Sequence, residues 1–181
     1  MKTGIKRLIA LLCALLIVLG LVGCGGEKEL ARVQATDFFT NFKEILGPIA
    51  DQFEVNQTAQ IDHEKGEIVE TWMLTDTMLN TEYRLEVAYS ADGWVRSVTA
   101  NTKKGTRADM TFAVLSYYVY KAIGAKGLKP DAFYEKYNLL TAEPETTLEN
   151  MELAPNVGAG ASTFFDNIYF TIVFVDENAP E

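Results

Sequence analysis

Cysteine is almost absent from this chain: two of its 181 residues are cysteines, Cys13 and Cys24. Both lie within the first 24 residues, so the sequence after them cannot form a disulfide, offer a thiol nucleophile or bind a metal through thiolates. Histidine is equally scarce, because His63 is the only one. Without cysteine, zinc sites in proteins generally use two or more histidines. We therefore expect neither a metal nor a cofactor in this protein.

Sequence motifs of nucleophilic and phosphate chemistry are also missing. The chain has no Gly-x-Ser-x-Gly elbow, which marks the nucleophilic serine of many hydrolases. The segment 158–163 is rich in small residues but lacks the lysine of a phosphate-binding loop, so we predict a flexible connection there. His63 has acidic neighbours in Asp62, Glu64 and Glu67. Adjacent residues rarely converge on one ion, and we interpret this segment as a solvated turn.

Carboxylates are the one abundant group that can carry catalysis. Paired carboxylates hydrolyse glycosidic bonds, and Asp76 with Glu82, or Glu149 with Glu152, are candidate pairs. Neither pair is distinguished among the 25 acids of the chain. A carboxylate-based hydrolase of a cell-wall polysaccharide is therefore an alternative function, and we assign no catalytic residue.

Positive charge is in deficit, since 16 lysines and arginines face 25 acids. This balance excludes nucleic acid as a partner bound through bulk charge. Seven of the bases fall in the segment 103–136, together with three acids. Two interpretations stay open: acidic and basic segments are neighbours in the fold, or a basic face is turned to an anionic membrane or wall polymer.

The first residues have the three parts of an export signal. Lys2, Lys6 and Arg7 give a positive start, and an uncharged apolar run of 15 residues follows over 8–22. Small residues come next, as at a signal cleavage site. The run is short for a permanent span, because a helix needs about 20 apolar residues to cross the hydrocarbon core.

The end of this run, Leu21, Val22, Gly23 and Cys24, resembles the lipobox of bacterial lipoproteins. The resemblance covers residues 1–24 only. It implies transfer of a diacylglycerol to the Cys24 thiol, cleavage between Gly23 and Cys24, and a palmitate-bearing protein at the extracytoplasmic face of the cell membrane. Two or more acyl chains hold a protein stably, whereas one chain gives marginal binding.

Cleavage at this site sets the composition of the mature chain. It removes three bases and no acid, so 13 bases remain against 25 acids, a net charge near −12. We expect a signal peptide over 1–23, an acylated cysteine with a short tether over 24–26, and one folded domain over 27–178. The 158 residues that remain are enough for one hydrophobic core.

The periodicity of apolar residues predicts helices and strands in the mature chain. The predicted helices are 27–46, 108–123 and 130–137. The predicted strands are 67–74, 81–90, 94–102 and 168–175, with 147–153 as a further candidate. The segment 51–61 fits a helical turn followed by a strand. The segment 155–162 is predicted to be a loop of small residues.

The order of these elements predicts an α+β fold in two layers, with helices packed on one face of an antiparallel sheet. Strand 168–175 is apolar on both faces and should lie inside the sheet. No internal repeat is visible in the sequence.

Aromatic residues suggest an interaction surface. Tyr117, Tyr118 and Tyr120 crowd one predicted helix, and successive helical residues point about 100° apart, so all three cannot be buried on one stripe. Exposed tyrosines are suited to recognising a protein or a sugar. We name these tyrosines and the bases that precede them as the candidate surface: Tyr117, Tyr118, Tyr120, Lys103, Lys104 and Arg107. The predicted function is a non-catalytic binding or accessory module, with an unknown protein or wall polymer as partner.

Overall fold

The computed structural model describes residues 29–105, 108–141, 143–147 and 150–175. One α-helix precedes the first four strands of the sheet, and a second follows them. A third, short α-helix precedes the last three strands. In chain order the elements are α2 (Ala35–Leu46), the 3-10 helix η1 (Gly47–Gln52), β1 (Phe53–Asp62), β2 (Glu67–Asp76), β3 (Thr81–Ser90), β4 (Val95–Lys103), α3 (Ala108–Ala122), α4 (Pro130–Lys136), β5 (Glu152–Ala154), β6 (Val157–Phe164) and β7 (Asn167–Phe174).

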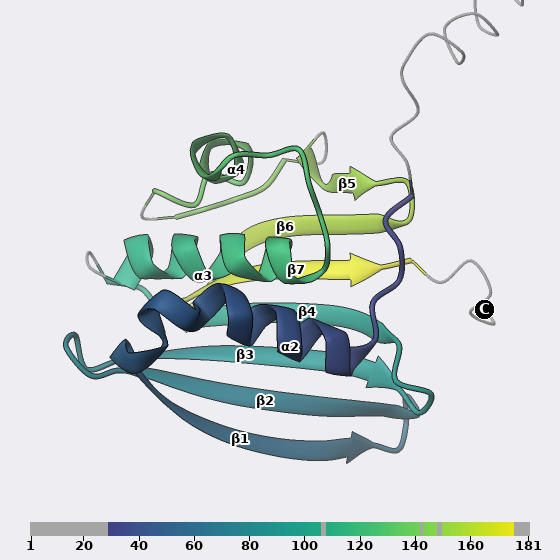
Figure 1. Cartoon of the computed structure of the whole chain (residues 1–181). Coiled ribbons are helices and arrows are strands. Elements are labelled where there is room, and N and C mark those ends of the chain that lie inside the picture. Colours follow the sequence, from purple (N-terminus) through teal and green to yellow (C-terminus); the bar gives the residue numbers. More distant parts are fainter. Residues whose placement is uncertain (1–28, 106–107, 142, 148–149, 176–181) are drawn as a thin grey trace, which may run out of the picture.

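The strands form one seven-stranded antiparallel sheet, in the order β1-β2-β3-β4-β7-β6-β5 (Figure 1). The first four strands follow one another as a meander joined by short turns. The last strand in the chain, β7, lies between β4 and β6, which confirms that this doubly apolar strand is internal.

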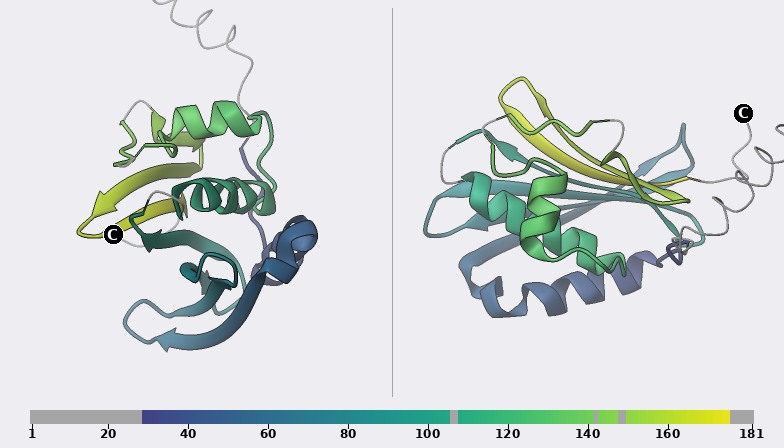
Figure 2. Two further views of the ribbon diagram at one scale, coloured as in Figure 1. Left: turned by 90° about the vertical axis from the view of Figure 1, so that its left-hand side faces the viewer. Right: turned by 90° about the horizontal axis from the view of Figure 1, so that it is seen from above.

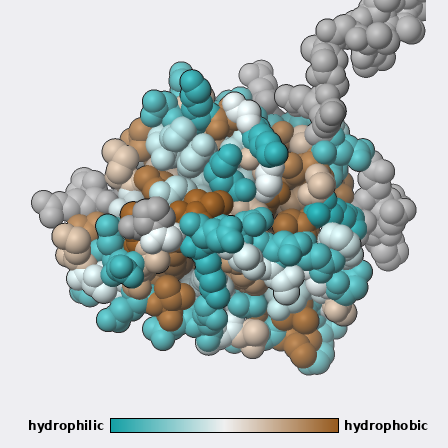
Figure 3. Space-filling model, in the orientation of Figure 1, coloured by the Kyte–Doolittle hydropathy of each residue, from teal (hydrophilic) through white to brown (hydrophobic). Residues whose placement is uncertain are grey.

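The three α-helices of the described residues lie on the same side of the curved sheet (Figure 2). The protein therefore has the two-layer α+β fold that the order of elements predicts. Helices α2 and α3 pack against each other, and α3 contacts β4. On the helix side the surface is mainly polar, with separate hydrophobic patches (Figure 3).

Strand alternation places the core between the two layers. One face of each strand buries its side chains under the helices, as Leu85 and Val87 of β3 do. Trp72 of β2 is the centre of the contact with α2: its ring stacks on Phe39 at 4.9 Å and meets Phe42 edge-on at 6.1 Å. Aromatic burial of this kind contributes several kcal/mol, about 3–5 kcal/mol for a Trp truncated to Ala.

The first predicted helix begins eight residues later than its apolar pattern suggests. Residues 29–33 have no helical structure, and Gln34 forms a β-bridge to Trp94. Leu30 is held by two bonds with the Asn156 side chain, its N–H donating at 3.0 Å and its carbonyl accepting at 2.9 Å. These bonds to distant parts of the chain outweigh the local helical pattern.

The predicted loop 155–162 is wrong, because most of it forms β6. Glycine and alanine have low strand propensity, but the backbone pairs with β7 in continuous register over eight residues. Ala159 and Ala161 are buried on the helix side, where the small side chains allow close packing. The candidate strand 147–153 shortens to β5.

Candidate binding site on the uncovered sheet face

The face of the sheet opposite the helices is polar and uncovered by any described helix. Strand alternation turns polar side chains to it, and the antiparallel register aligns them in rows across the strands. Among the rows that span six strands, the one nearest the β2–β3 turn consists of Asn56, Met73, Arg84, Asn101, Tyr169 and Ser162.

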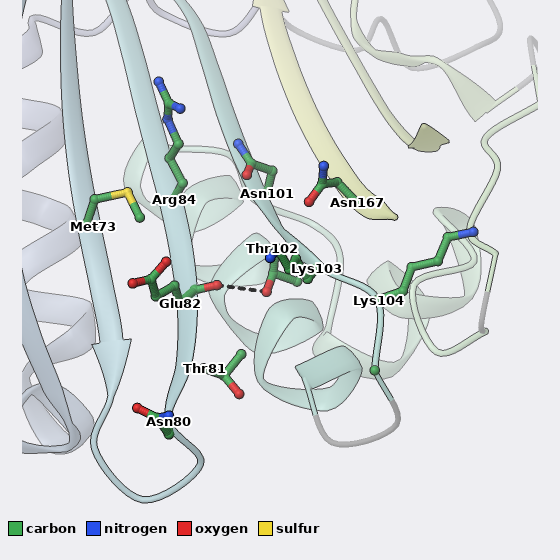
Figure 4. A pocket seen from close by; sticks show the side chains of 11 residues that line it. Met73, Asn80, Thr81, Glu82, Arg84, Asn101, Thr102, Lys103, Lys104 and Asn167 are labelled. Carbon is green, nitrogen blue, oxygen red and sulfur yellow. Dashed lines mark hydrogen bonds between the residues drawn. The ribbon is translucent and has the colours of Figure 1, made fainter. Parts of the chain in front are cut away.

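A hollow of about 660 Å³ opens at one end of this face (Figure 4). It lies between the β2–β3 turn and the segment that joins β4 to α3, and the start of β7 borders it. We call it the polar hollow. Its described lining residues are Met73, Asn80, Thr81, Glu82, Arg84, Asn101, Thr102, Lys103, Lys104, Gly105 and Asn167.

Strand register holds the polar side chains of the hollow in place. Arg84 of β3 lies opposite Asn101 of β4, and Lys103 lies opposite Asn167 of β7. An ion pair with Glu86 also orients the Arg84 guanidinium, with 2.6 Å between Nη2 and Oε1. Four strand positions therefore fix the spacing of the donors, as the close view shows for Arg84, Asn101 and Asn167 (Figure 4).

The turn at the edge of the hollow is built by a buried aspartate. Asp76 is 5% exposed and accepts hydrogen bonds from the N–H groups of Met78 and Leu79, at 2.8 and 2.9 Å. Asn80 completes the turn with a φ of 50°, a left-handed conformation that asparagine tolerates well. Buried Thr102 adds a bond from its hydroxyl to the carbonyl of Glu82, at 2.9 Å.

Hydrogen-bond donors and positive charge dominate the hollow. Its described lining has three bases, Arg84, Lys103 and Lys104, and one acid, Glu82. Lys104 also pairs with Glu143, with 3.2 Å between Nζ and Oε1. Amides and bases at fixed spacing suit a ligand with carboxylate, phosphate or hydroxyl groups.

A second hollow of about 390 Å³ adjoins the first, and Lys104 lines both. Its rim includes Phe165, which forms an edge-on pair with Phe164 at the tip of the β6–β7 hairpin, with ring centroids 4.4 Å apart. Both rings are exposed. The sequence places them directly before Asp166 and Asn167, a turn signal that identifies a hairpin tip but gives no sign of the exposure.

The structure separates the predicted interaction residues into two groups. Lys103 and Lys104 line the polar hollow, whereas the tyrosines belong to α3 on the other side of the sheet. Tyr120 is fully buried: its hydroxyl donates to the carbonyl of Lys126 at 2.6 Å and accepts the N–H of Leu128 at 3.2 Å.

The other members of the predicted surface are less enclosed. Tyr117 is half-buried, stacks on Tyr120 and donates its hydroxyl to the carbonyl of Leu128 at 3.3 Å. Tyr118 is also half-buried. Arg107 lies outside the described residues. Tyr117 and Tyr120 thus contribute to packing α3 against the loop and helix that follow it.

Of the two candidate carboxylate pairs, Asp76 and Glu82 lie on opposite faces of the sheet. Asp76 points to the helix side of β2, and Glu82 lines the hollow on the opposite face. Glu152 is exposed on β5, and Glu149 lies outside the described residues. His63 is exposed in the β1–β2 turn.

Two further properties hold for the described part of the chain. Within it, no group of three or more His, Cys, Asp or Glu side chains is arranged to hold a metal ion. Among the helices described, none is long and apolar enough to cross a membrane. Comparisons of the chain with protein-family models, with curated proteins and with solved structures found no match.

Proposed function

We propose that this chain is a bacterial lipoprotein, held at the extracytoplasmic face of the cell membrane through acylated Cys24, and that its domain is a non-catalytic binding or accessory module. The signal-like segment before Cys24 supports the anchor. The polar hollow on the uncovered sheet face is the single observation that supports the binding role.

The position of the hollow agrees with a partner away from the membrane. The chain enters the domain at Leu30, which is bonded to Asn156 in the β5–β6 turn. The hollow lies at the other end of the sheet, where β6 ends and β7 begins. The eight residues of β6 separate these ends by roughly 25 Å. A wall polymer or a protein with acidic or hydroxyl groups therefore fits the hollow as partner.

A carboxylate-based hydrolase is the weaker proposal. Such enzymes use two carboxylates about 5–10 Å apart, whereas Glu82 is the one acid among the described residues that line the hollow. Glu82→Gln separates the two functions. Loss of a wall-cleaving activity in this variant would favour the hydrolase.

The anchor is tested by metabolic labelling with palmitate. The unmodified protein should incorporate the label, and its mature form should begin at an acylated Cys24. Cys24→Ala should abolish both, because the thiol is the acceptor. Label retained in Cys24→Ala would refute the lipobox interpretation.

The binding role is tested by pull-down from the cell envelope with the acylated protein. Arg84→Ala with Lys103→Ala removes two bases from the hollow, and we expect at least tenfold less of the specific partner to be recovered. Lys126→Ala with Lys129→Ala is the matched control, because it removes the same charge from exposed positions after α3. Equal losses in the two double variants would mean that the hollow is not the binding site.

A further inference from the structure

Strand β1 is an unusually open edge of the sheet. It has ten residues and pairs only with β2 among the described strands. Phe53 is its one buried residue, and the strand runs along the lower margin of the sheet, beyond α2 (Figure 1). Its outer row of backbone N–H and C=O groups has no neighbouring strand in the part of the chain that the structure describes.

The opposite edge of the sheet is closed by the chain itself. Thr146 donates its N–H to the carbonyl of Ala161 at 2.9 Å, and the carbonyl of Met151 accepts the N–H of Ala159 at 2.7 Å. The three-residue strand β5 continues this cover. The two edges therefore differ: of the strands that the structure describes, β1 is the one whose outer side presents a long row of unpaired backbone groups.

The central part of β1, residues 55–61, also lacks the features by which proteins prevent edge pairing. Edge strands are usually short, bulged, or interrupted by lysine or proline. The segment 55–61 contains no proline and no charged residue. The register between β1 and β2 runs without a shift over all ten pairs. The strand is thus a regular template for a further strand.

The side chains of β1 define the pattern of a complementary strand. On the helix side the strand presents Val55, Gln57, Ala59 and Ile61, and its two large apolar side chains are exposed, Val55 to 39% and Ile61 to 63%. On the other side, Asn56 and Thr58 are polar and exposed. Cross-strand pairs stabilise a sheet when side chains of like chemistry meet on one face. A complementary strand therefore has alternating apolar and polar residues.

Charge at the ends of the strand selects for a basic partner. Asp51, Glu54 and Glu64 are exposed near its two ends. Lys65 is the nearby base in the turn, and it already pairs with Asp62, with 3.8 Å between Nζ and Oδ2. Lysine or arginine beside the docked segment would offset this negative charge.

We propose that β1 is a docking edge for strand addition, and that its occupant is an extended segment of another polypeptide. The segment has seven or more residues, alternates apolar and polar side chains, and carries lysine or arginine at its ends. A second copy of this chain fits less well, because antiparallel self-pairing centred on Thr58 places Glu54 opposite Asp62. This inference is independent of the function proposed for the hollow.

The first test uses a synthetic peptide as the probe. A peptide of alternating valine and threonine, with two lysines at each end, is added to the protein as purified from membranes in detergent. We expect saturable binding and slowed hydrogen exchange within residues 55–61. The control peptide has the same sequence with N-methyl groups on alternate residues, which remove the donors of one edge. It should bind at least tenfold more weakly.

The second test uses proline in β1. In an antiparallel strand, the N–H groups of Thr58 and Ala59 point to opposite sides, so one bonds to β2 and the other faces outward. The melting temperatures of Thr58→Pro and Ala59→Pro identify which N–H faces outward. Proline at that position breaks no bond to β2, so the variant should keep its melting temperature within a few degrees. We expect that variant to lose at least tenfold in peptide affinity, whereas Thr58→Ala should bind normally.

Three results would overturn the proposal. The first is absence of peptide binding at millimolar concentration. The second is equal binding of the N-methylated peptide, since charge alone would then explain the contact. The third is a concentration-dependent dimer that protects residues 55–61 from exchange, which would make a second copy the occupant of the edge.

Discussion

Phe165 has a backbone conformation that is unfavourable for a bulky residue. Its φ is 51° at the tip of the β6–β7 hairpin, and its side chain is 80% exposed. Left-handed backbone costs a non-glycine residue about 1 kcal/mol, and little burial offsets that cost here. We predict that Phe165→Gly raises the free energy of unfolding by about 0.5–1 kcal/mol, measured by urea titration.

The neighbouring phenylalanine provides the control for this prediction. Phe164 is the last residue of β6, it is also exposed, and its φ is not positive. Phe164→Gly should lower stability, because glycine in a strand costs about 0.5–1 kcal/mol. Equal effects of the two substitutions would contradict the strain at Phe165.

Tyr137 makes stability sensitive to alkaline pH. Its ring is buried against Phe133 and Phe170, and its hydroxyl has no hydrogen-bond partner within the described structure. Burial raises the pKa of Tyr137 well above the usual 10.0, and the nearby Tyr120 adds to the shift. Above pH 10 the unfolded chain loses this proton while the folded chain keeps it. Stability is therefore intact below pH 10 and falls as pH rises further.

Tyr137→Phe should reduce this loss. Each proton difference contributes up to about 1.4 kcal/mol per pH unit, so the variant should lose stability less steeply between pH 10 and 12. At pH 7 it should be as stable as the unmodified protein or about 1 kcal/mol more stable, because an unpaired buried hydroxyl disappears. Tyr120→Phe, which removes two hydrogen bonds, should destabilise the protein at pH 7. A Tyr137→Phe variant with an unchanged alkaline slope would contradict the argument.

At the scale of single elements, the β2–β3 turn depends on one carboxylate. Asp76 is buried and accepts two backbone N–H groups. Asp76→Ala leaves those donors without their acceptor, and we predict a loss of about 2–3 kcal/mol, measured by thermal and urea unfolding. Because the same turn borders the polar hollow, partner binding should weaken as well.

The β1–β2 turn, which an exposed aspartate supports, provides the comparison for the β2–β3 turn. Asp62 accepts the N–H groups of Glu64 and Lys65 in the β1–β2 turn, at 3.1 and 3.2 Å, and these bonds are exposed to solvent. Asp62→Ala should therefore cost less, about 0.5–1 kcal/mol. A larger loss at Asp62 than at Asp76 would mean that burial does not set the strength of these turns.

Elements with strong local periodicity were predictable from the sequence. The alternation in 81–90 predicts the bounds of β3, and the apolar stripe of 108–123 predicts α3 to within one residue. The doubly apolar 168–175 predicts an internal strand, which β7 is. In these segments the side chains that pack the core also set the local period, so pattern and fold agree.

β6 and the polar hollow were not predictable in this way. β6 is a strand because β7 pairs with it, and its small residues give no local signal of that pairing. Lys103 and Lys104 were candidates from charge alone, whereas Arg84, Asn101 and Asn167 come together through strand order. Such a site depends on register between distant segments, which periodicity within one segment does not determine.

At the scale of the whole molecule, the sheet has two distinct ends and one open side among the described residues. The chain enters at Leu30, the polar hollow lies at the far end, and β1 runs between these ends along the open edge. With the anchor proposed at Cys24, the hollow is presented away from the membrane. A partner segment on β1 would then extend the sheet sideways without blocking the hollow.

The stability of the molecule should depend on its core alone. Among the residues that the structure describes, the buried hydrophobic ones lie between Ala35 and Phe174, and no cysteine follows Cys24 in the sequence. We predict that the chain from Gly25 onward folds cooperatively by itself, with the same melting temperature with and without reductant, because there is no disulfide to reduce. EDTA should also leave the melting temperature unchanged. A shift of more than about 4 °C with either reagent, roughly 1–2 kcal/mol for a domain of this size, would show that a covalent or metal link contributes to the fold.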